Sequence, residues 1–169
     1  MKTLLLMRHG KSSWDNASLA DFERPLAQRG IKASKRIGRE LVSRRWVPTL
    51  VLVSPALRTQ QTWELVAGEL SGGPTVVAVE SLYDATPDEL LAELHGVEEK
   101  TETLLVVGHN PGLQNLALAI ADKGSEARAL ARLGEKFPTA AVARFVFEGT
   151  WQGLAEAQLT HCLRPKDLG

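Results

Sequence analysis

The segment Leu4-Leu5-Leu6-Met7-Arg8-His9-Gly10-Lys11 is the most informative part of this sequence about its architecture. Its first four residues form a continuous apolar run of the length typical of a buried parallel strand, and the run ends abruptly at Arg8 and His9. Gly10 permits a tight exit at which the backbone can approach a ligand. Open α/β sheets bind ligands at the carboxyl ends of their strands, so these residues lie where a site is expected. The alternative is a strand end that carries two solvated polar side chains.

Length and charge limit the possible architectures and partners. The 169 residues fit one domain, predicted to span 1–169, and an apolar fraction of 44% is ordinary for a globular protein. Twenty Lys and Arg residues balance twenty Asp and Glu residues. Because no overall field attracts polyanions, we expect neither nucleic acid nor a membrane as partner, and any anion site must be local.

Cys162 is the only cysteine of the sequence, so it can form neither an internal disulfide nor a thiolate metal site by itself. That usage favours a reducing compartment. No apolar stretch approaches the roughly 20 residues that span a bilayer, and the opening apolar run is too short for a signal peptide. The sequence therefore predicts a cytoplasmic protein.

The remaining pattern alternates strands with helices. Strands are predicted at 49–53, 75–79, 103–107, 139–147 and 157–163, and helices at 27–45, 55–70, 86–96, 127–136 and after Asn110-Pro111. Such alternation predicts an α/β fold, a three-layer α/β/α sandwich with a mostly parallel sheet. The last two strands, joined by a turn at 148–150, predict an antiparallel hairpin at or near the sheet edge.

The first predicted helix, 27–45, is amphipathic. Its apolar stripe is expected at Ile31, Ile37, Leu41 and Val42, with the basic residues Lys32, Lys35, Arg36 and Arg39 facing water.

Two further strand-to-helix junctions carry basic residues. Ser54 is expected to cap the helix that starts at Pro55, which places Arg58 in its first turn. An arginine there opposes the helix dipole, and that cost favours a functional role. His109 follows the strand 103–107 in the same way, with Asn110-Pro111 opening the next helix.

Parallel strands bring Arg8, His9, Arg58 and His109 to one sheet edge, where they form an electropositive cluster. A zinc site is disfavoured because two arginines would repel the cation. A passive phosphate pocket is possible. A phosphoryl-transfer site fits better, because one histidine can attack phosphorus while the arginines neutralise its oxygens. No Gly-Lys-Ser/Thr phosphate loop is present.

Three ordered motifs resemble the histidine phosphatase superfamily, also called phosphoglycerate mutase-like. These are Arg8-His9-Gly10, Ser54-Pro55-x-x-Arg58-x-x-Gln61-Thr62 and Gly108-His109-Asn110-Pro111. The smaller pieces Asp21-x-x-Arg24-Pro25-Leu26 and Glu80-x-Leu82-Tyr83 are similar to its short branch, the SixA-type phosphohistidine phosphatases. The resemblance runs from the first strand through at least His109.

The resemblance implies a phosphoglycerate mutase-like fold and a phosphatase that needs no metal and no cofactor. His9 would be the nucleophile and form a phosphohistidine intermediate that water resolves. Arg8, Arg58 and His109 would bind the phosphoryl oxygens. We expect the other ring nitrogen of His9 to donate to a backbone carbonyl, which fixes the tautomer.

Three further residues have open roles. Glu80, with Asp84 behind it, is the nearest candidate for a proton donor, or else an ordinary strand-end carboxylate. Arg24 reaches the substrate from the long loop or merely pairs with Asp21 on the surface. Gly10 is a candidate for substrate binding through its backbone.

The substrate is expected to be phosphohistidine on a protein such as a histidine-containing phosphotransfer domain of a signalling system, because nothing resembles a lid over the site. The alternatives are a broad phosphomonoesterase acting on small phosphorylated metabolites and a non-catalytic phosphate-binding protein. Mutase activity, which needs a closed site, is disfavoured. The sequence does not predict an oligomeric state.

Overall fold

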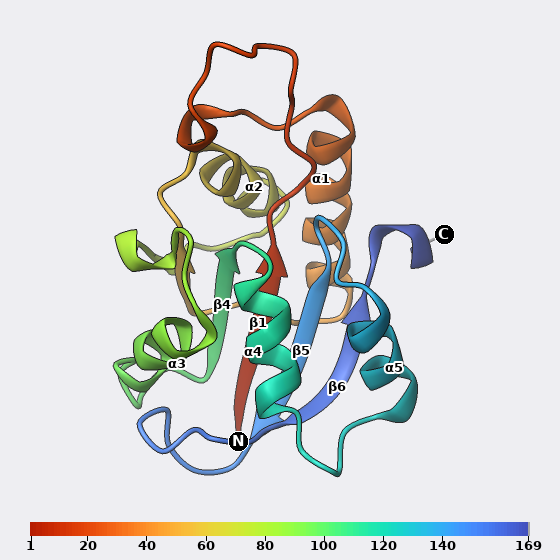
Figure 1. The fold of residues 1–169 in the computed structure, drawn as a ribbon. Helices are drawn as coiled ribbons and strands as arrows, with labels where there is room; N and C mark the ends of the chain where they lie inside the picture. Colours follow the sequence, from red (N-terminus) through yellow and green to blue (C-terminus); the bar gives the residue numbers. More distant parts are fainter. Residues whose placement is uncertain (169) are drawn as a thin grey trace.

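Within residues 1–168, which the computed structural model describes, six strands form one sheet in the order β3-β2-β4-β1-β5-β6 (Figure 1). Gly169, the last residue of the predicted domain, lies outside the described residues. The strands are β1 (Lys2–Arg8), β2 (Leu50–Val53), β3 (Thr75–Ala78), β4 (Thr103–Gly108), β5 (Val142–Phe147) and β6 (Gln158–Leu163). The first four run parallel, and β5 pairs antiparallel with both β1 and β6. The predicted mostly parallel sheet with a hairpin at its edge is confirmed.

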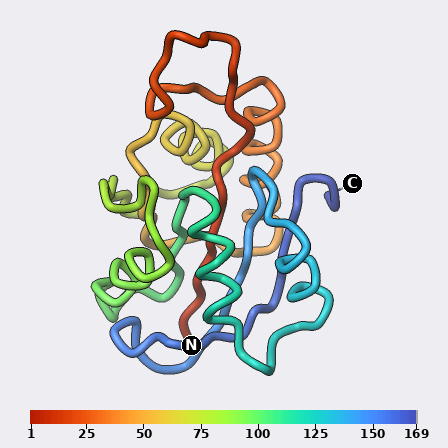
Figure 2. Tube along the Cα trace, in the orientation of Figure 1, coloured from red at the N-terminus to blue at the C-terminus, as the bar shows by residue number. Residues whose placement is uncertain are grey.

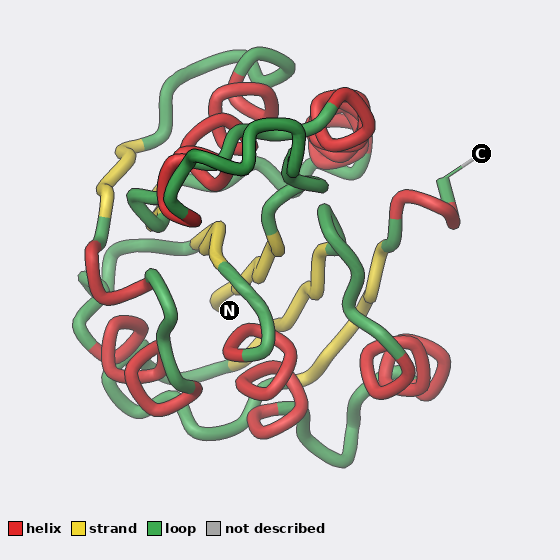
Figure 3. Tube along the Cα trace, turned by 45° about the horizontal axis from the view of Figure 1, so that its top comes forward, coloured by secondary structure: helices red, strands yellow, loops and turns green. Residues whose placement is uncertain are grey.

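Helices cover both faces of the sheet, as Figure 3 shows with the strands lying between two groups of helices. The helices are α1 (Gln28–Ser43), α2 (Leu57–Ala67), α3 (Pro87–His95), α4 (Gly112–Ile120) and α5 (Ala127–Glu135). Residues of α1 and α2 pack on one face, and residues of α3, α4 and α5 pack on the other. The predicted three-layer sandwich is therefore confirmed. No helix among the described residues has the length and apolarity needed to cross a membrane.

Strand β1 lies inside the sheet and contributes to both core clusters. Leu4 and Leu6 face the α3–α5 side, Leu5 and Met7 face the α1–α2 side, and all four are fully buried. A strand buried on both faces needs apolar side chains at every position, which explains the continuous apolar run. The run thus identified the central strand correctly.

Strand register brings the predicted junctions together. Arg8 pairs with Gly108 in the β1–β4 ladder, and Val53 pairs with Val107 in the β2–β4 ladder. The residues that follow these pairs therefore emerge side by side at the carboxyl edge of the sheet. Figure 2 shows the chain leaving β1 at this edge toward the long loop that precedes α1.

Two predicted helix starts are wrong by about one or two residues. Helix α2 begins at Leu57 with Ala56 as its N-cap, instead of at Pro55 after a Ser54 cap. The Ser54 hydroxyl instead forms a hydrogen bond with the His109 ring, with Oγ 2.7 Å from Nε2. Helix α4 begins at Gly112 with Pro111 as its N-cap. The Asn110 side chain accepts from the Gln114 backbone N–H at 3.3 Å and donates to the carbonyl of Phe137 at 3.0 Å. By contrast, α3 begins within one residue of its predicted start, behind a capping box in which Thr86 accepts from the Glu89 backbone N–H.

The apolar stripe of α1 differs from the predicted one. Val42 is 40% exposed, whereas the buried positions are Gly30, Ser34, Ile37, Gly38 and Leu41. Small residues at this surface let the helix approach the chain that leaves β1. A Cβ atom on Gly30 would lie 2.2 Å from the carbonyl oxygen of Lys11, a distance that only glycine accommodates. The N-terminus of α1 is therefore held directly against the segment that follows His9.

Candidate active site

The carboxyl edge of the sheet holds a cavity of about 250 Å³, called here the cationic cavity. It is lined by Arg8, His9, Lys11, Ser12, Trp14, Arg24, Arg58, Asp84, His109, Asn110 and Thr139. The structure thus brings together the four residues predicted from the strand-to-helix junctions, and it adds Arg24 from the long loop. Four cations and one carboxylate in this lining make the cavity suited to an anion.

His9 is oriented by a backbone contact. Its Nδ1 atom lies 2.6 Å from the carbonyl oxygen of Gly10, which can only accept, so Nδ1 donates and Nε2 carries the lone pair. This confirms the predicted bond to a backbone carbonyl. Burial lowers the pKa of His9 to about 4, against the hydrogen bond to Gly10, and the charges of Arg58 and Arg8 lower it further. A neutral imidazole with its lone pair on Nε2 is a competent nucleophile.

His109 lies beside His9, with the two ring centroids 5.3 Å apart. Its Nε2 is 2.7 Å from Ser54 Oγ, and its Nδ1 is 3.5 Å from Arg58 Nη2. A guanidinium can only donate, so Nδ1 accepts and Nε2 donates to Ser54 in this arrangement. Burial, then the neighbouring His9 and Arg58, lower the pKa of His109 to about 3. The second histidine is therefore also neutral near pH 7.

Arg58 is fixed from the opposite side by Asp21. Arg58 Nη1 donates to the Asp21 carbonyl oxygen at 2.7 Å, and Nη2 donates to the Asp21 carboxylate at 3.0 Å. Arg58 Nε donates a long hydrogen bond to His9 Nε2 at 3.4 Å. The guanidinium thus lies beside the lone pair of His9, where it can meet an oxygen of a bound phosphoryl group.

Asp21 also holds two other residues of the loop region. It accepts from Arg24 Nη1 at 3.0 Å and from the Tyr83 hydroxyl at 2.6 Å. The Tyr83 hydrogen bond, together with those from Arg58 and Arg24, lowers the pKa of Asp21 to about 2 despite some desolvation. The sequence motif placed Asp21 next to Arg24, but its contact with Arg58 was not predicted, because loop residues show no periodicity that reveals a distant partner.

Arg24 enters the cavity and is 6% exposed, so the prediction that it reaches the site is supported by its position. Its Nη2 donates to Ser12 Oγ at 2.5 Å and its Nε donates to the Ser13 carbonyl at 3.1 Å. The guanidinium carbon also lies 3.2 Å from the ring centroid of Trp14, which is 70% exposed. The loop therefore presents one arginine and one aromatic ring at the mouth of the cavity.

Arg8 completes the cation set at the end of β1. Its Nη1 donates to the Phe137 carbonyl at 3.2 Å, and its buried Nε has no hydrogen-bond partner within residues 1–168. A buried guanidinium with unused donor capacity is typical of a site that binds an oxyanion.

Two predicted residues lie outside the cavity lining. Glu80 is exposed and begins the short 3-10 helix Glu80–Leu82, whereas the neighbouring acid Asp84 does line the cavity. The backbone N–H of Gly10 donates to Thr62 Oγ1 at 3.0 Å and is thus already paired. A Cβ atom on Gly10 would lie 2.8 Å from the Gly30 carbonyl oxygen, so glycine at this position serves the packing of α1.

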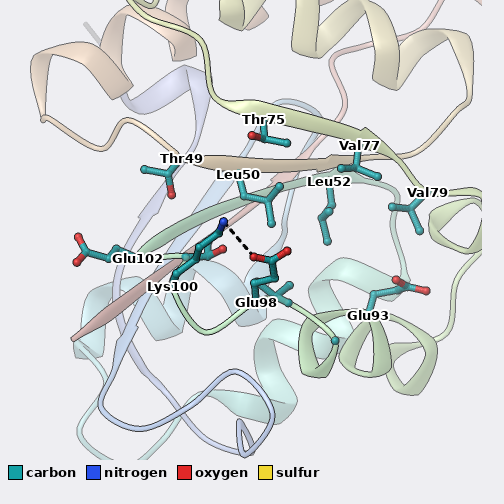
Figure 4. Close-up of a pocket in the computed structure, with 13 residues that line it drawn as sticks. Thr49, Leu50, Leu52, Thr75, Val77, Val79, Glu93, Glu98, Lys100 and Glu102 are labelled. Atoms are coloured by element: carbon teal, nitrogen blue, oxygen red, sulfur yellow. Dashed lines mark ion pairs between the residues drawn. The ribbon is translucent and has the colours of Figure 1, made fainter.

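A larger hollow of about 620 Å³ lies across the β2 and β3 face near the amino ends of these strands (Figure 4). Leu50, Leu52 and Val77 form part of its apolar floor, and Glu98 pairs with Lys100 at 3.2 Å on its rim. This lining contains neither histidine nor arginine. The cationic cavity is smaller, but it is the one that combines a nucleophile with anion-binding groups, so chemistry rather than size identifies the candidate site.

Metal ligation has little support in the donor set. In the part of the chain that the structure describes, no three His, Cys, Asp or Glu side chains gather in a way that could hold a metal ion. The groups that line the cavity are instead donors toward an anion.

Comparisons with known proteins agree with this geometry. A model of the histidine phosphatase superfamily (branch 1) matches residues 4–86. An uncharacterized protein of Mycobacterium tuberculosis is 38% identical over 146 residues, which cover 86% of this chain and 89% of that protein. Two solved structures, each described as a "putative phosphohistidine phosphatase SixA", are also similar. The one from Nakamurella multipartitia is 29% identical with a TM-score of 0.83, covering 97% of this chain and 96% of that one. The one from Agrobacterium tumefaciens is 25% identical with a TM-score of 0.83, covering 97% and 98%.

Proposed function

The chain belongs to the histidine phosphatase superfamily as a SixA-like phosphatase, and from this premise we propose that it hydrolyses phosphohistidine on a protein. The proposal assigns His9 as the nucleophile and Arg8, Arg58 and His109 as the groups that bind the phosphoryl oxygens. Membership of the phosphatase family is the starting point, and the substrate and the roles of the individual residues are what we propose.

The orientation of His9 carries the proposal. Its Nδ1 bond to the Gly10 carbonyl, 2.6 Å long, leaves the Nε2 lone pair beside Arg58. Burial keeps the ring neutral, with its pKa lowered to about 4. A binding pocket alone needs donors, whereas this ring presents an acceptor atom to an electrophile in a cationic cavity.

In the first step, His9 Nε2 attacks phosphorus and a P–N bond forms as the P–N bond of the substrate breaks. The leaving imidazole takes the bond's electron pair and a proton from solvent water. In the second step, water attacks the phosphorus atom on His9, loses a proton, and releases inorganic phosphate with the Nε2 lone pair restored. No metal is required, because the fixed arginines meet the charge on the phosphoryl oxygens.

His109 is proposed to donate to a phosphoryl oxygen through Nδ1. That donation requires the proton to be on Nδ1, and the Ser54 hydroxyl then donates to Nε2 across the same 2.7 Å contact. A serine hydroxyl can play either part, so Ser54 permits both tautomers of a neutral ring. Ser54 is therefore a positioning residue of the proposed mechanism.

Protonation of the leaving group needs no buried acid in this scheme. An imidazole nitrogen of a phosphoramidate accepts a proton more readily than an ester oxygen does. Asp84 is the carboxyl group at the cavity, whereas Glu80 stays outside its lining. Placement in the cytoplasm and a role in signalling remain predictions from the sequence.

The test compares a phosphorylated histidine-containing phosphotransfer domain with p-nitrophenyl phosphate, both with EDTA, for wild type, His9→Ala and His95→Gln. His95 is a matched control because its ring contacts the Leu154 carbonyl on the α3 side, outside the cavity lining. We expect EDTA-resistant loss of phosphohistidine that vanishes in His9→Ala and persists in His95→Gln. If only p-nitrophenyl phosphate is hydrolysed, the proposed phosphoprotein substrate is wrong and a small phosphate ester takes its place in the proposal. Turnover by His9→Ala would refute the assignment of His9 as the nucleophile.

A further inference from the structure

Helix α1 carries a concentration of positive charge that the proposed chemistry does not use. We define its basic face as Arg29, Lys32, Lys35, Arg36 and Arg39, which recur at spacings of three and four residues. Glu40 is the single acidic residue of the helix, in a chain whose formal net charge is zero. The basic face is thus a local field on an otherwise balanced molecule.

The basic face points to solvent on a rigidly held helix. Arg29, Lys32 and Lys35 are exposed and have no ion-pair partner within residues 1–168, whereas Arg39 pairs with Glu69 at 3.2 Å. The opposite side of the helix is closely packed, because a Cβ atom on Gly38 would lie 3.0 Å from the Val66 carbonyl oxygen of α2. The charges are therefore presented by a fixed scaffold.

The N-terminus of α1 lacks the acidic residues and the capping side chain that usually stabilise the start of a helix. Its first turn holds no acidic residue and includes Arg29, and its N-cap Ala27 supplies no side-chain hydrogen bond. Both features are unfavourable for an isolated helix. That cost favours a functional role for Arg29.

The N-terminal end of α1, where the basic face starts, is joined to a residue of the cationic cavity. The Ala27 backbone N–H donates to the Lys11 carbonyl at 2.8 Å, and Lys11 itself lines the cavity. Figure 1 shows α1 starting beside the chain that leaves β1 and then running along the sheet. A polypeptide whose phosphorylated side chain enters the cavity past Lys11 can thus continue along α1.

We propose that the basic face of α1 is a docking surface for an acidic segment of the phosphoprotein substrate. The inference rests on the proposed function, because it assigns the partner of that same site. An α1 of 16 residues is about 24 Å long, which an extended acidic segment of about eight residues spans. Complementary charge of this kind raises the association rate and sets partner choice.

The experiment uses two synthetic peptides with the same phosphohistidine core and an arm of about eight residues, either all Glu or all Ser. Their kcat/KM values are measured with wild type, with Lys32→Glu/Lys35→Glu, and with the matched control Lys100→Glu/Lys123→Glu. The control lysines are exposed near the amino ends of the strands, and neither of them lines the cationic cavity. Binding of the unphosphorylated, fluorescent arms is titrated in parallel.

We expect wild type to prefer the Glu arm by about tenfold in kcat/KM at low salt and to lose the preference near about 0.5 M NaCl. Lys32→Glu/Lys35→Glu should abolish the preference without changing turnover of the Ser-arm peptide, and the control should retain it. The proposal would be overturned if both arms bind equally, or if the control variant loses the preference for the Glu arm to the same extent. It would also be overturned if an RNA oligonucleotide binds more tightly than the Glu arm. If the Glu arm binds selectively while neither peptide is hydrolysed, the docking surface stands and the phosphohistidine substrate falls.

Discussion

Ser54 Oγ lies 2.7 Å from His109 Nε2, and both groups are buried. The hydroxyl is the hydrogen-bond partner of that nitrogen within residues 1–168, so the bond fixes the orientation of the ring and accommodates either tautomer. A residue with the sequence signature of a helix cap is thus part of the site.

Replacing Ser54 with alanine should lower kcat by roughly tenfold to a hundredfold, because a buried ring nitrogen loses its partner. Single-turnover rates with phosphohistidine substrate measure the effect. Ser34→Ala is the matched control, since Ser34 is equally buried and its hydroxyl donates to the Gly30 carbonyl at 2.7 Å inside α1. Equal losses of kcat in the two variants would contradict the positioning role of Ser54.

Replacing Asp21 with asparagine should lower kcat/KM by about tenfold, because a neutral amide holds the Arg58 and Arg24 guanidinium groups less firmly. Steady-state kinetics check this. Asp15→Asn in the same loop is the control, since the Asp15 side chain is exposed and has no recorded partner in the described chain. A retained kcat/KM in Asp21→Asn would show that the arginines hold their positions without the carboxylate.

Acid should destabilise the protein through its two cavity histidines. Their folded pKa values, about 4 for His9 and about 3 for His109, lie below the ordinary value of 6.5. The unfolded chain therefore binds protons first, and stability that is present above pH 6.5 is lost as the pH falls toward about 4. Urea unfolding at several pH values measures the slope, which should be shallower in a His9→Gln/His109→Gln variant. An unchanged slope would assign acid sensitivity to other groups.

Replacing Gly30 with alanine should destabilise the fold by about 1–3 kcal/mol and reduce activity, because the new Cβ meets the backbone of Lys11. Thermal unfolding and kcat/KM are the two readouts. Gly134→Ala in α5 is the control, since a Cβ there meets nothing within 4 Å and should stabilise the helix by about 0.5–1 kcal/mol. Similar behaviour of the two variants would refute the close approach of α1.

The positions of Arg8, His9, Arg58 and His109 followed from strand ends alone, because parallel pairing brings strand carboxyl ends to one edge whatever the loops do. The layers followed in the same way from alternating patterns. These inferences rest on periodicity, which is a property of single segments.

Contacts between residues of distant segments leave no periodic pattern in the sequence. Ser54 and Asn110 are residue types typical of helix caps, but each also has a tertiary partner, the His109 ring for Ser54 and the Phe137 carbonyl for Asn110. The Asp21–Arg58 pair joins residues 37 positions apart through a loop without periodicity. Its detection required the fold itself.

Pairing of β1 with β4 must form before the site around His9 is complete, so activity can appear only late in folding. His9 lies in the first ten residues, but its partner ring belongs to His109, and the backbone N–H of Arg8 bonds to the Ala141 carbonyl. During synthesis from the N-terminus, the proposed nucleophile His9 therefore emerges long before the residues that surround it in the folded protein. Such long-range pairing forms slowly relative to local helices. Recovery of phosphatase activity on refolding should thus report closure of the central sheet and lag behind the appearance of helical structure.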